Sequence, residues 1–306
     1  MAEETVAVPN EVVEASTDLA GPKILIQGDS GGGKTYALGT MADWASRQTP
    51  PLNVRVLFTE NGLETFKSYW NDPPLDPQSA KPIRPARPIP SNIAWHTASP
   101  GAQTLASLKD AAQKVGLLSY KSLTEMQDPS RGVNNPAFKM LAALENFPDD
   151  RTGKMLGNIG GWGNDTIFMV DSLSELAEGY KRMATGNKPV MSQPEYQVAQ
   201  NNLINFLRFL TQGPKFTLVM TAHLQKQVNE LTGGTTLMTS AIGKAIADDI
   251  PKLFSEVLYS YREGLGWYWD TSAPNVVTKT RYLPIRAKID PNLGYIMDKW
   301  LIRGRG

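Results

Sequence analysis

The chain has 306 residues, 41% hydrophobic and 20% charged, a composition typical of a globular protein and not of a disordered chain or a coiled coil. Its 31 basic and 30 acidic residues leave a net charge of +1, so any binding of nucleic acid needs a local basic patch. The absence of cysteine excludes disulfides, thiolate zinc sites and cysteine nucleophiles, and two histidines cannot form a multi-histidine metal centre.

Residues 1–22 are predicted to be a flexible acidic leader. They carry five acidic and no basic side chains, lack the apolar core of a signal peptide, and end in Gly21-Pro22. No later segment is apolar for the ~20 residues that a membrane helix needs. We therefore expect a cytoplasmic protein without membrane association.

Short apolar segments in the first third of the chain predict a parallel sheet. Three of them are expected to be strands: residues 23–27, 54–58 and 92–96. Between the first two, apolar residues recur at the spacing of one helix face: Leu38, Met41, Ala42 and Ala45. Strand, helix and strand in this order indicate a βαβ unit, and hence parallel strands.

Two segments are predicted to interrupt this alternation. Residues 72–90 contain seven prolines, which exclude a helix or an inner strand and indicate a surface loop. The basic side chains of this loop could be solvated or could contact a phosphate backbone: Lys81, Arg84 and Arg87. A helix is expected over 103–115, and residues 116–164 are interpreted as an insertion without an assigned role.

The alternation resumes with a strand over 166–170, two amphipathic helices and a strand over 216–220. Further on, alternating segments that include VVTKTRYL predict antiparallel strands at the edge of the sheet. The sequence therefore predicts one α/β domain over residues 23–290, with a mainly parallel sheet flanked by helices, followed by a C-terminal tail over 291–306.

Residues 28–35 match G-x-x-x-x-G-K-[ST] at every fixed position, between the first strand and its helix. Glycines let successive backbone N–H groups face an anion, and the helix presents its positive end to it. Lys34 would neutralise the β- and γ-phosphates of ATP, and the Thr35 hydroxyl would bind Mg²⁺. The expected nucleotide contacts are Gly28, Asp29, Ser30, Gly31, Gly32, Gly33, Lys34, Thr35 and Tyr36.

Asp171 follows the apolar strand TIFMV, where a nucleotide site of this type needs a second carboxylate near Mg²⁺. We predict that Asp171 and Thr35 hold the metal at the carboxyl ends of neighbouring strands. An aspartate at this position could alternatively cap the helix that begins near residue 173.

This order of motifs resembles the RecA-like class of P-loop ATPases. Within that class, the chain is similar from about Lys23 to Lys288 to phage-encoded RecA-like ATPases of single-strand annealing and homologous recombination. The resemblance implies a RecA-like core, ATP and Mg²⁺ as cofactors, and single-stranded DNA as partner. It also implies a homo-oligomer, ring or filament, with nucleotide at the subunit interface.

The catalytic base is predicted outside the metal site, because Ser172, not glutamate, follows Asp171. In RecA-like proteins the base is a glutamate just after the second strand, which the resemblance places at Glu60. Its carboxylate could orient the attacking water. Glu64 and Glu175 remain alternatives for this role.

The resemblance also implies that His223 senses the γ-phosphate at the end of its strand, although RecA carries glutamine there. A neutral imidazole can donate or accept the one hydrogen bond needed. The segment that follows, from Lys226 to Lys244, resembles a DNA-contacting loop, with glycines, hydroxyls and lysines but no aromatic residue to stack on bases. A plain mobile surface loop is the alternative.

Lys279 and Arg281 are two residues apart and are predicted to share one face of a late strand. RecA-like assemblies place such a basic pair against the nucleotide of the adjacent subunit, where it stabilises the transition state. A solvated edge strand is the alternative.

The leading hypothesis is an ATP-dependent RecA-like protein that assembles on single-stranded DNA and promotes annealing or recombination. A helicase or helicase loader of the same superfamily is the first alternative. An ATPase that acts without nucleic acid is the second, and the near-neutral net charge is compatible with it.

Overall fold

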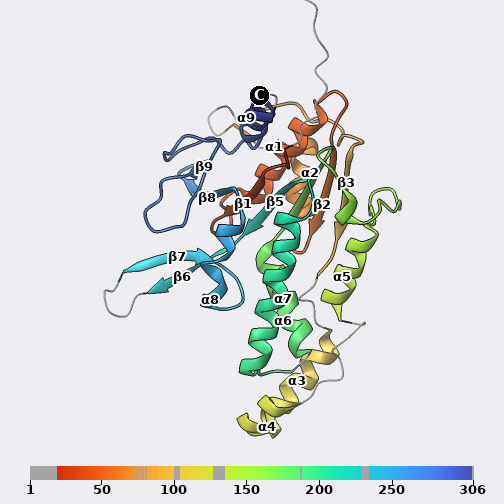
Figure 1. Ribbon diagram of the computed structural model, residues 1–306, viewed down its shortest axis with the longest axis vertical. Coiled ribbons are helices and arrows are strands. Elements are labelled where there is room, and N and C mark those ends of the chain that lie inside the picture. Colours follow the sequence, from red (N-terminus) through yellow and green to blue (C-terminus); the bar gives the residue numbers. More distant parts are fainter. Residues whose placement is uncertain are drawn as a thin grey trace, which may run out of the picture.

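The computed structural model describes residues 19–73, 75–76, 79, 81–99, 104–126, 135–186, 188–228 and 234–304. A seven-stranded sheet in the order β3-β2-β4-β5-β1-β8-β9 forms its centre (Figure 1). Its strands are β1 Lys23–Gln27, β2 Asn53–Phe58, β3 Ile93–Thr97, β4 Thr166–Asp171, β5 Thr217–Ala222, β8 Glu256–Glu263 and β9 Gly266–Asp270. All neighbouring strands are parallel except β8 and β9, which confirms the predicted α/β class.

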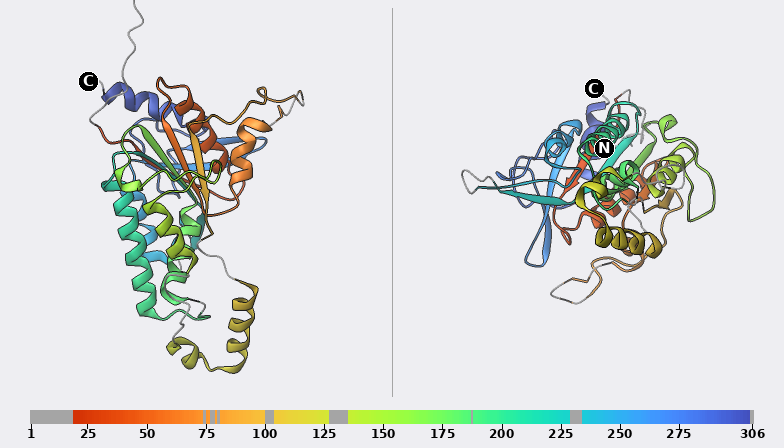
Figure 2. Two further views of the ribbon diagram at one scale, coloured as in Figure 1. Left: turned by 90° about the vertical axis from the view of Figure 1, so that its right-hand side faces the viewer. Right: turned by 90° about the horizontal axis from the view of Figure 1, so that it is seen from below.

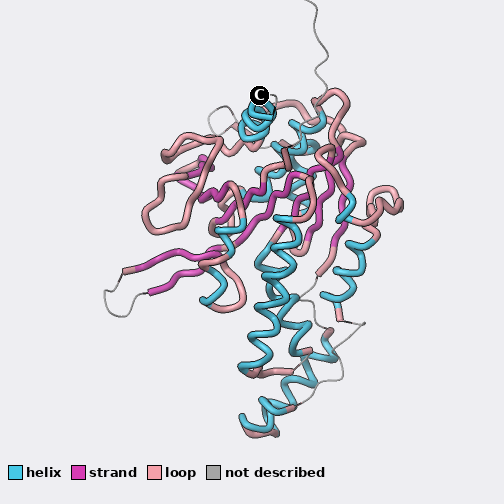
Figure 3. The backbone as a smooth tube through the Cα atoms, in the orientation of Figure 1, coloured by secondary structure: helices cyan, strands magenta, loops and turns pink. Residues whose placement is uncertain are grey.

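The sheet lies between two layers of helices (Figures 2 and 3). Strands β1, β4 and β5 are buried along their whole length, as expected of continuous apolar runs. Successive side chains of β1 enter opposite cores, Ile24 and Ile26 on one face and Leu25 on the other. Helices α1 Lys34–Ser46, α2 Leu63–Asn71 and α9 Gly294–Gly304 cover the first face, and α5 Pro136–Glu145, α6 Leu173–Thr185 and α7 Gln193–Gln212 cover the second.

The remaining elements are attached to this core. Strands β6 Leu224–Val228 and β7 Thr235–Thr239 form a separate antiparallel ribbon that projects from the body (Figure 1). Helices α3 Leu105–Leu117 and α4 Tyr120–Glu125 extend away from the sheet. Two 3-10 turns (Ile159–Gly161, Ile250–Leu253) and the short α8 Lys244–Ala247 complete the described chain. Among these described residues, no helix combines the length and the hydropathy needed to span a bilayer.

Several segments predicted as irregular have defined structure. Within the insertion 116–164, α5 buries Met140 and Leu144 against the sheet, while residues 127–134 lie outside the described residues. In the loop predicted to contact DNA, β7 replaces part of the flexible segment, and residues 229–233 are not described. Of the leader, residues 1–18 are not described, but Pro22 is buried and accepts a hydrogen bond from the Leu218 amide.

The predicted late strand over 276–286 is wrong. This segment is irregular, and two isolated bridges join it to strands: Lys279 to Val257 of β8, and Val276 to Leu237 of β7. The turn that follows is held by the buried Glu256, which accepts hydrogen bonds from the Thr280 hydroxyl at 2.6 Å and the Arg281 amide at 2.8 Å. Hydrogen bonds to the buried carboxylate therefore fix a turn where the alternation predicted a strand.

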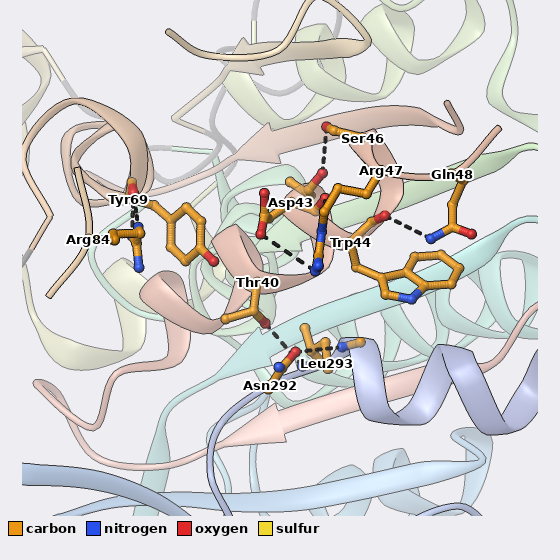
Figure 4. A network of polar contacts seen from close by, with 12 residues as sticks. Thr40, Asp43, Trp44, Ser46, Arg47, Gln48, Tyr69, Arg84, Asn292 and Leu293 are labelled. Atoms are coloured by element: carbon orange, nitrogen blue, oxygen red, sulfur yellow. Dashed lines mark hydrogen bonds and ion pairs between the residues drawn. The ribbon is translucent and has the colours of Figure 1, made fainter. Parts of the chain in front are cut away.

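The predicted C-terminal tail is also wrong, because α9 is part of the core up to Gly304. Ile296, Met297 and Trp300 are buried against α1. Two hydrogen bonds fix the contact. Trp44 Nε1 donates to Asp298 Oδ1 at 2.7 Å. The Leu293 amide, just before α9, donates to Thr40 Oγ1 at 3.0 Å (Figure 4).

Trp300→Ala is expected to lower the free energy of unfolding by about 3–5 kcal/mol, because it removes a large side chain that is only 2% exposed. Urea unfolding followed by circular dichroism measures the change. Ile302→Ala, at a position 68% exposed in the same helix, should stay within about 0.5 kcal/mol of wild type. Equal stability of the two variants would mean that the helix does not dock.

Candidate functional site

The phosphate-binding loop occupies the turn between β1 and α1, as predicted. Its first glycine is required by a close approach, since a Cβ at Gly28 would lie 2.0 Å from the carbonyl oxygen of Ser260 in β8. At the other end Gly33 has φ +84°, a conformation that side-chain-bearing residues rarely adopt, and it forms the N-terminal cap of α1. The loop therefore packs closely against the β8–β9 hairpin and leads directly into the first turn of α1.

Lys34 lies inside this loop and is 6% exposed. Its Nζ donates hydrogen bonds to the carbonyl oxygens of Gly28 and Asp29, both at 2.8 Å. Burial lowers the pKa of Lys34, and the nearby charges of Asp171, Glu60 and Asp29 oppose that shift. The ammonium group is thus held over the cradle that the sequence assigns to phosphate.

Thr35 and Asp171 meet at the metal position predicted for them. Thr35 Oγ1 donates to Asp171 Oδ2 at 2.8 Å. The strands that lead to these residues, β1 and β4, are not neighbours, contrary to the prediction, because β5 lies between them. Thr221 at the end of β5 donates to the other carboxylate oxygen. Burial raises the pKa of Asp171, while these hydroxyl groups and Lys34 oppose the shift. One carboxylate and one hydroxyl beside a phosphate cradle are a donor set that fits Mg²⁺.

Glu60 and His223 are in contact, although the sequence predicted them for two separate roles. Their Oε2 and Nε2 atoms are 3.3 Å apart. The hydrogen bond from His223 is the largest cause of a lowered pKa for Glu60, which keeps the carboxylate ionised. Thr59 sets the position of Glu60, because its amide donates to the Asp171 carbonyl at 2.7 Å and its hydroxyl donates to the Ser172 carbonyl at 2.8 Å.

The geometry separates Glu60 from the two alternative carboxylates. Glu60 lines both the cavity that contains Lys34 and an adjacent cavity of about 690 Å³, whereas Glu64 lines only the adjacent one. Glu175 lies in the first turn of α6, where burial and the charge of Glu60 raise its pKa. Of the three, Glu60 is the one beside the phosphate loop.

A cavity of about 420 Å³ joins these groups. Its described lining consists of Ser30, Gly31, Gly32, Gly33, Lys34, Thr35, Tyr36, Glu60, Thr65, Ser68, His223 and Trp267. One end is therefore the phosphate loop with its charged neighbours, and other parts of the wall are aromatic and hydroxyl side chains. A volume of this size can take a small ligand such as a nucleotide.

The structure does not bring the predicted basic residues to this cavity within one chain. Lys279 Nζ donates to the Phe254 carbonyl at 2.6 Å, and the Arg281 side chain is exposed. Lys226 is exposed on the β6–β7 ribbon, and Lys244 begins α8. None of these four residues is among the described residues that line the cavity.

The Pro-rich loop is irregular where it is described, and two of its three basic side chains are bound within the protein. Arg84 donates to the Tyr36 hydroxyl at 2.9 Å, and Arg87 pairs with Asp43 of α1. Lys81 is exposed. The Arg84 and Arg87 contacts explain how a loop with so many prolines is held against α1 and α2.

Sequence reasoning missed several residues of the site, among them Thr221, Ser260 and Trp267, and also Thr65 and Ser68 of the cavity wall. Thr221 could have been found, because it is a polar residue at the carboxyl end of an apolar strand, where Asp171 also lies. Ser260 and Trp267 gave no local signal. Ser260 Oγ donates to the Gly32 carbonyl at 2.7 Å and Trp267 Nε1 to the Gly31 carbonyl at 3.0 Å, contacts that depend on how the β8–β9 hairpin packs on a loop more than 220 residues earlier.

Comparisons with known proteins agree with this geometry. A search of curated proteins finds no match to the chain. A family model described as an AAA domain, AAA_24, matches residues 20–282, a range that includes the phosphate loop, Asp171, Glu60 and His223. Because the match covers most of the sequence, the chain belongs to this AAA-domain family of P-loop ATPases.

Proposed function

We propose that this ATPase depends on Mg²⁺, assembles on single-stranded DNA and promotes annealing or homologous recombination. The observation that carries the proposal is the 3.3 Å contact between Glu60, in the nucleotide cavity, and His223, the residue that directly precedes β6 of the projecting ribbon. The proposed γ-phosphate-sensing residue, His223, is thereby linked to the segment that resembles a DNA-contacting loop.

The residues of the cavity divide the work of ATP hydrolysis. Lys34 binds the β- and γ-phosphates, and Thr35 with Asp171 would hold Mg²⁺. When bound, Mg²⁺ neutralises charge on the phosphate oxygens. Glu60, kept ionised by His223, accepts a hydrogen bond from the attacking water and orients it. His223 senses the γ-phosphate when ATP is bound, while its contact with Glu60 persists.

The β6–β7 ribbon supports a nucleic-acid role through its position and its exposed groups. Its two strands pair with each other, and β7 also forms a bridge through Leu237 to Val276. In the described sheets β6 has no second neighbouring strand, so its outer edge is available to a partner. The His223 carbonyl accepts from the Ser240 amide at 2.8 Å, which ties both ends of the ribbon to the sensing residue. Lys226 is exposed on β6 and can neutralise a phosphate. A shift of His223 would therefore move the base of the ribbon.

Assembly completes the proposed site. Lys279 and Arg281 lie outside the cavity of their own chain, and we propose that they act on the nucleotide of an adjacent subunit in a ring or filament. A single chain should then hydrolyse ATP slowly, and turnover per subunit should rise with protein concentration.

ATPase activity measured with and without single-stranded DNA, across protein concentration, tests the proposal. We expect stimulation by DNA, a rise in specific activity with concentration, and DNA binding that weakens steeply with salt. Absence of DNA binding at low salt with ATP and Mg²⁺ present would remove the DNA function and leave an ATPase with another partner. Duplex unwinding coupled to hydrolysis would instead identify a helicase.

His223→Ala is expected to shift the acid side of the pH–rate profile to higher pH. The hydrogen bond from His223 lowers the pKa of Glu60, so its loss raises that pKa and protonates the base at a pH where the wild type is still active. The pH dependence of kcat for ATP hydrolysis measures the shift. His96→Ala is the matched control, since His96 binds Asp150 at 2.9 Å and is not in the cavity lining described above. An unchanged acid limb in His223→Ala would contradict the coupling.

A further inference from the structure

We infer that the nucleobase of the bound nucleotide stacks on Trp267, in an aromatic pocket that Trp267 forms with Tyr36. The inference rests on the proposed nucleotide function and assigns the part of the cavity that the phosphate-binding residues leave unused. Both rings line the same cavity as Lys34 and Thr35. One molecule can therefore reach the phosphate loop and the aromatic wall together.

Trp267 is fixed in place before any ligand arrives. It is the second residue of β9, and its Nε1 donates to the Gly31 carbonyl at 3.0 Å. Its ring also lies against Gly33, where a Cβ would come within 2.9 Å of Cδ1. The indole is thus hydrogen-bonded to the phosphate loop and lies beside the N-terminus of α1. Its position relative to the phosphate site is therefore fixed.

Tyr36 is held by a second set of contacts. Its ring is nearly parallel to that of Trp267, with an interplanar angle of 21° and centroids 6.3 Å apart. Its hydroxyl accepts from Arg84 Nη1 at 2.9 Å, and Arg84 lies 3.7 Å above the Tyr69 ring and bonds the Tyr69 carbonyl (Figure 4). Arg84 of the Pro-rich loop is therefore a positioning residue for this wall, which lowers the ordering cost when a base binds.

The chemistry of the wall matches a base better than a charged group. The acidic and basic side chains of the described lining all belong to the phosphate end: Lys34, Glu60 and His223. Away from them, the lining offers the two aromatic rings and the hydroxyl groups of Thr65 and Ser68. Aromatic faces stack on any nucleobase, and a hydroxyl can donate to or accept from its edge.

The test compares ATP with inorganic tripolyphosphate, both with Mg²⁺, by isothermal titration calorimetry. Trp267→Ala should weaken ATP binding by about tenfold or more through the lost stacking, and leave tripolyphosphate within about twofold of wild type. Trp267→Phe retains a stacking face but loses the bond to Gly31, and should recover most of the ATP affinity. Leu265→Ala, exposed in the same hairpin turn, is the matched control and should change neither ligand.

Unchanged ATP affinity in Trp267→Ala would overturn the inference. An equal loss of both ligands would also overturn it, because Trp267 would then act only by shaping the phosphate loop. If the wild type binds tripolyphosphate but gains nothing from the adenosine part of ATP, the base pocket fails while the phosphate site stands. If the wild type binds neither ligand, the proposed nucleotide function itself fails.

Discussion

Lys34→Ala is expected to reduce ATP turnover by at least about 10²- to 10³-fold and to weaken ATP binding in parallel. Lys34 is the only lysine or arginine among the described residues that line the cavity. Its ammonium group is buried, so its attraction to phosphate is screened less than at an exposed site. Its loss therefore removes the main positive side chain that faces the phosphates in a single chain.

The measurement is kcat/KM for ATP, with calorimetry for binding and circular dichroism to confirm folding. Lys81→Ala is the control, since Lys81 is an exposed lysine of the Pro-rich loop and should keep wild-type turnover. Wild-type turnover in Lys34→Ala would show that ATP is hydrolysed elsewhere. Such a result would overturn the site and the assignments of Thr35 and Asp171 with it.

What could be predicted from sequence is the part of the site that is built from local segments. The phosphate loop joins a strand to the helix that follows it. Asp171 ends β4 and Glu60 lies two residues after β2, so pattern and spacing place them. Parallel strands bring their carboxyl ends to one edge of the sheet. This explains why Thr35 and Asp171, which are far apart in the chain, are in contact.

The parts that could not be predicted depend on long-range packing. Ser260 and Trp267 reach the loop only because β8 pairs with β1 and carries its hairpin over the glycines. For the segment around Lys279, alternation predicted a strand, but the hydrogen bonds of buried Glu256 fix a turn instead. The C-terminal helix did carry a signal, the helical spacing of Ile296, Met297 and Trp300, which its glycine- and arginine-rich end obscured.

Glu60→Gln is expected to bind ATP normally and to hydrolyse it about 10²- to 10⁴-fold more slowly, the usual contribution of a general base. Glutamine has the same shape and can keep a hydrogen bond to His223, so the cavity and its link to the ribbon should persist. Only the negative charge that attracts the proton of the attacking water is lost. Binding and turnover should therefore separate in this variant, whereas they fall together in Lys34→Ala.

Single-turnover hydrolysis with calorimetric binding measures this separation, and the two alternative carboxylates provide the controls. Glu64→Gln alters an adjacent cavity and Glu175→Gln alters the start of α6, so each should keep most of the wild-type rate. A normal rate in Glu60→Gln, with a large loss in either control, would transfer the role of base to that residue. Under the proposed DNA function, the same variant should release single-stranded DNA more slowly than the wild type in the presence of ATP, because the ATP-bound state persists when hydrolysis is slow.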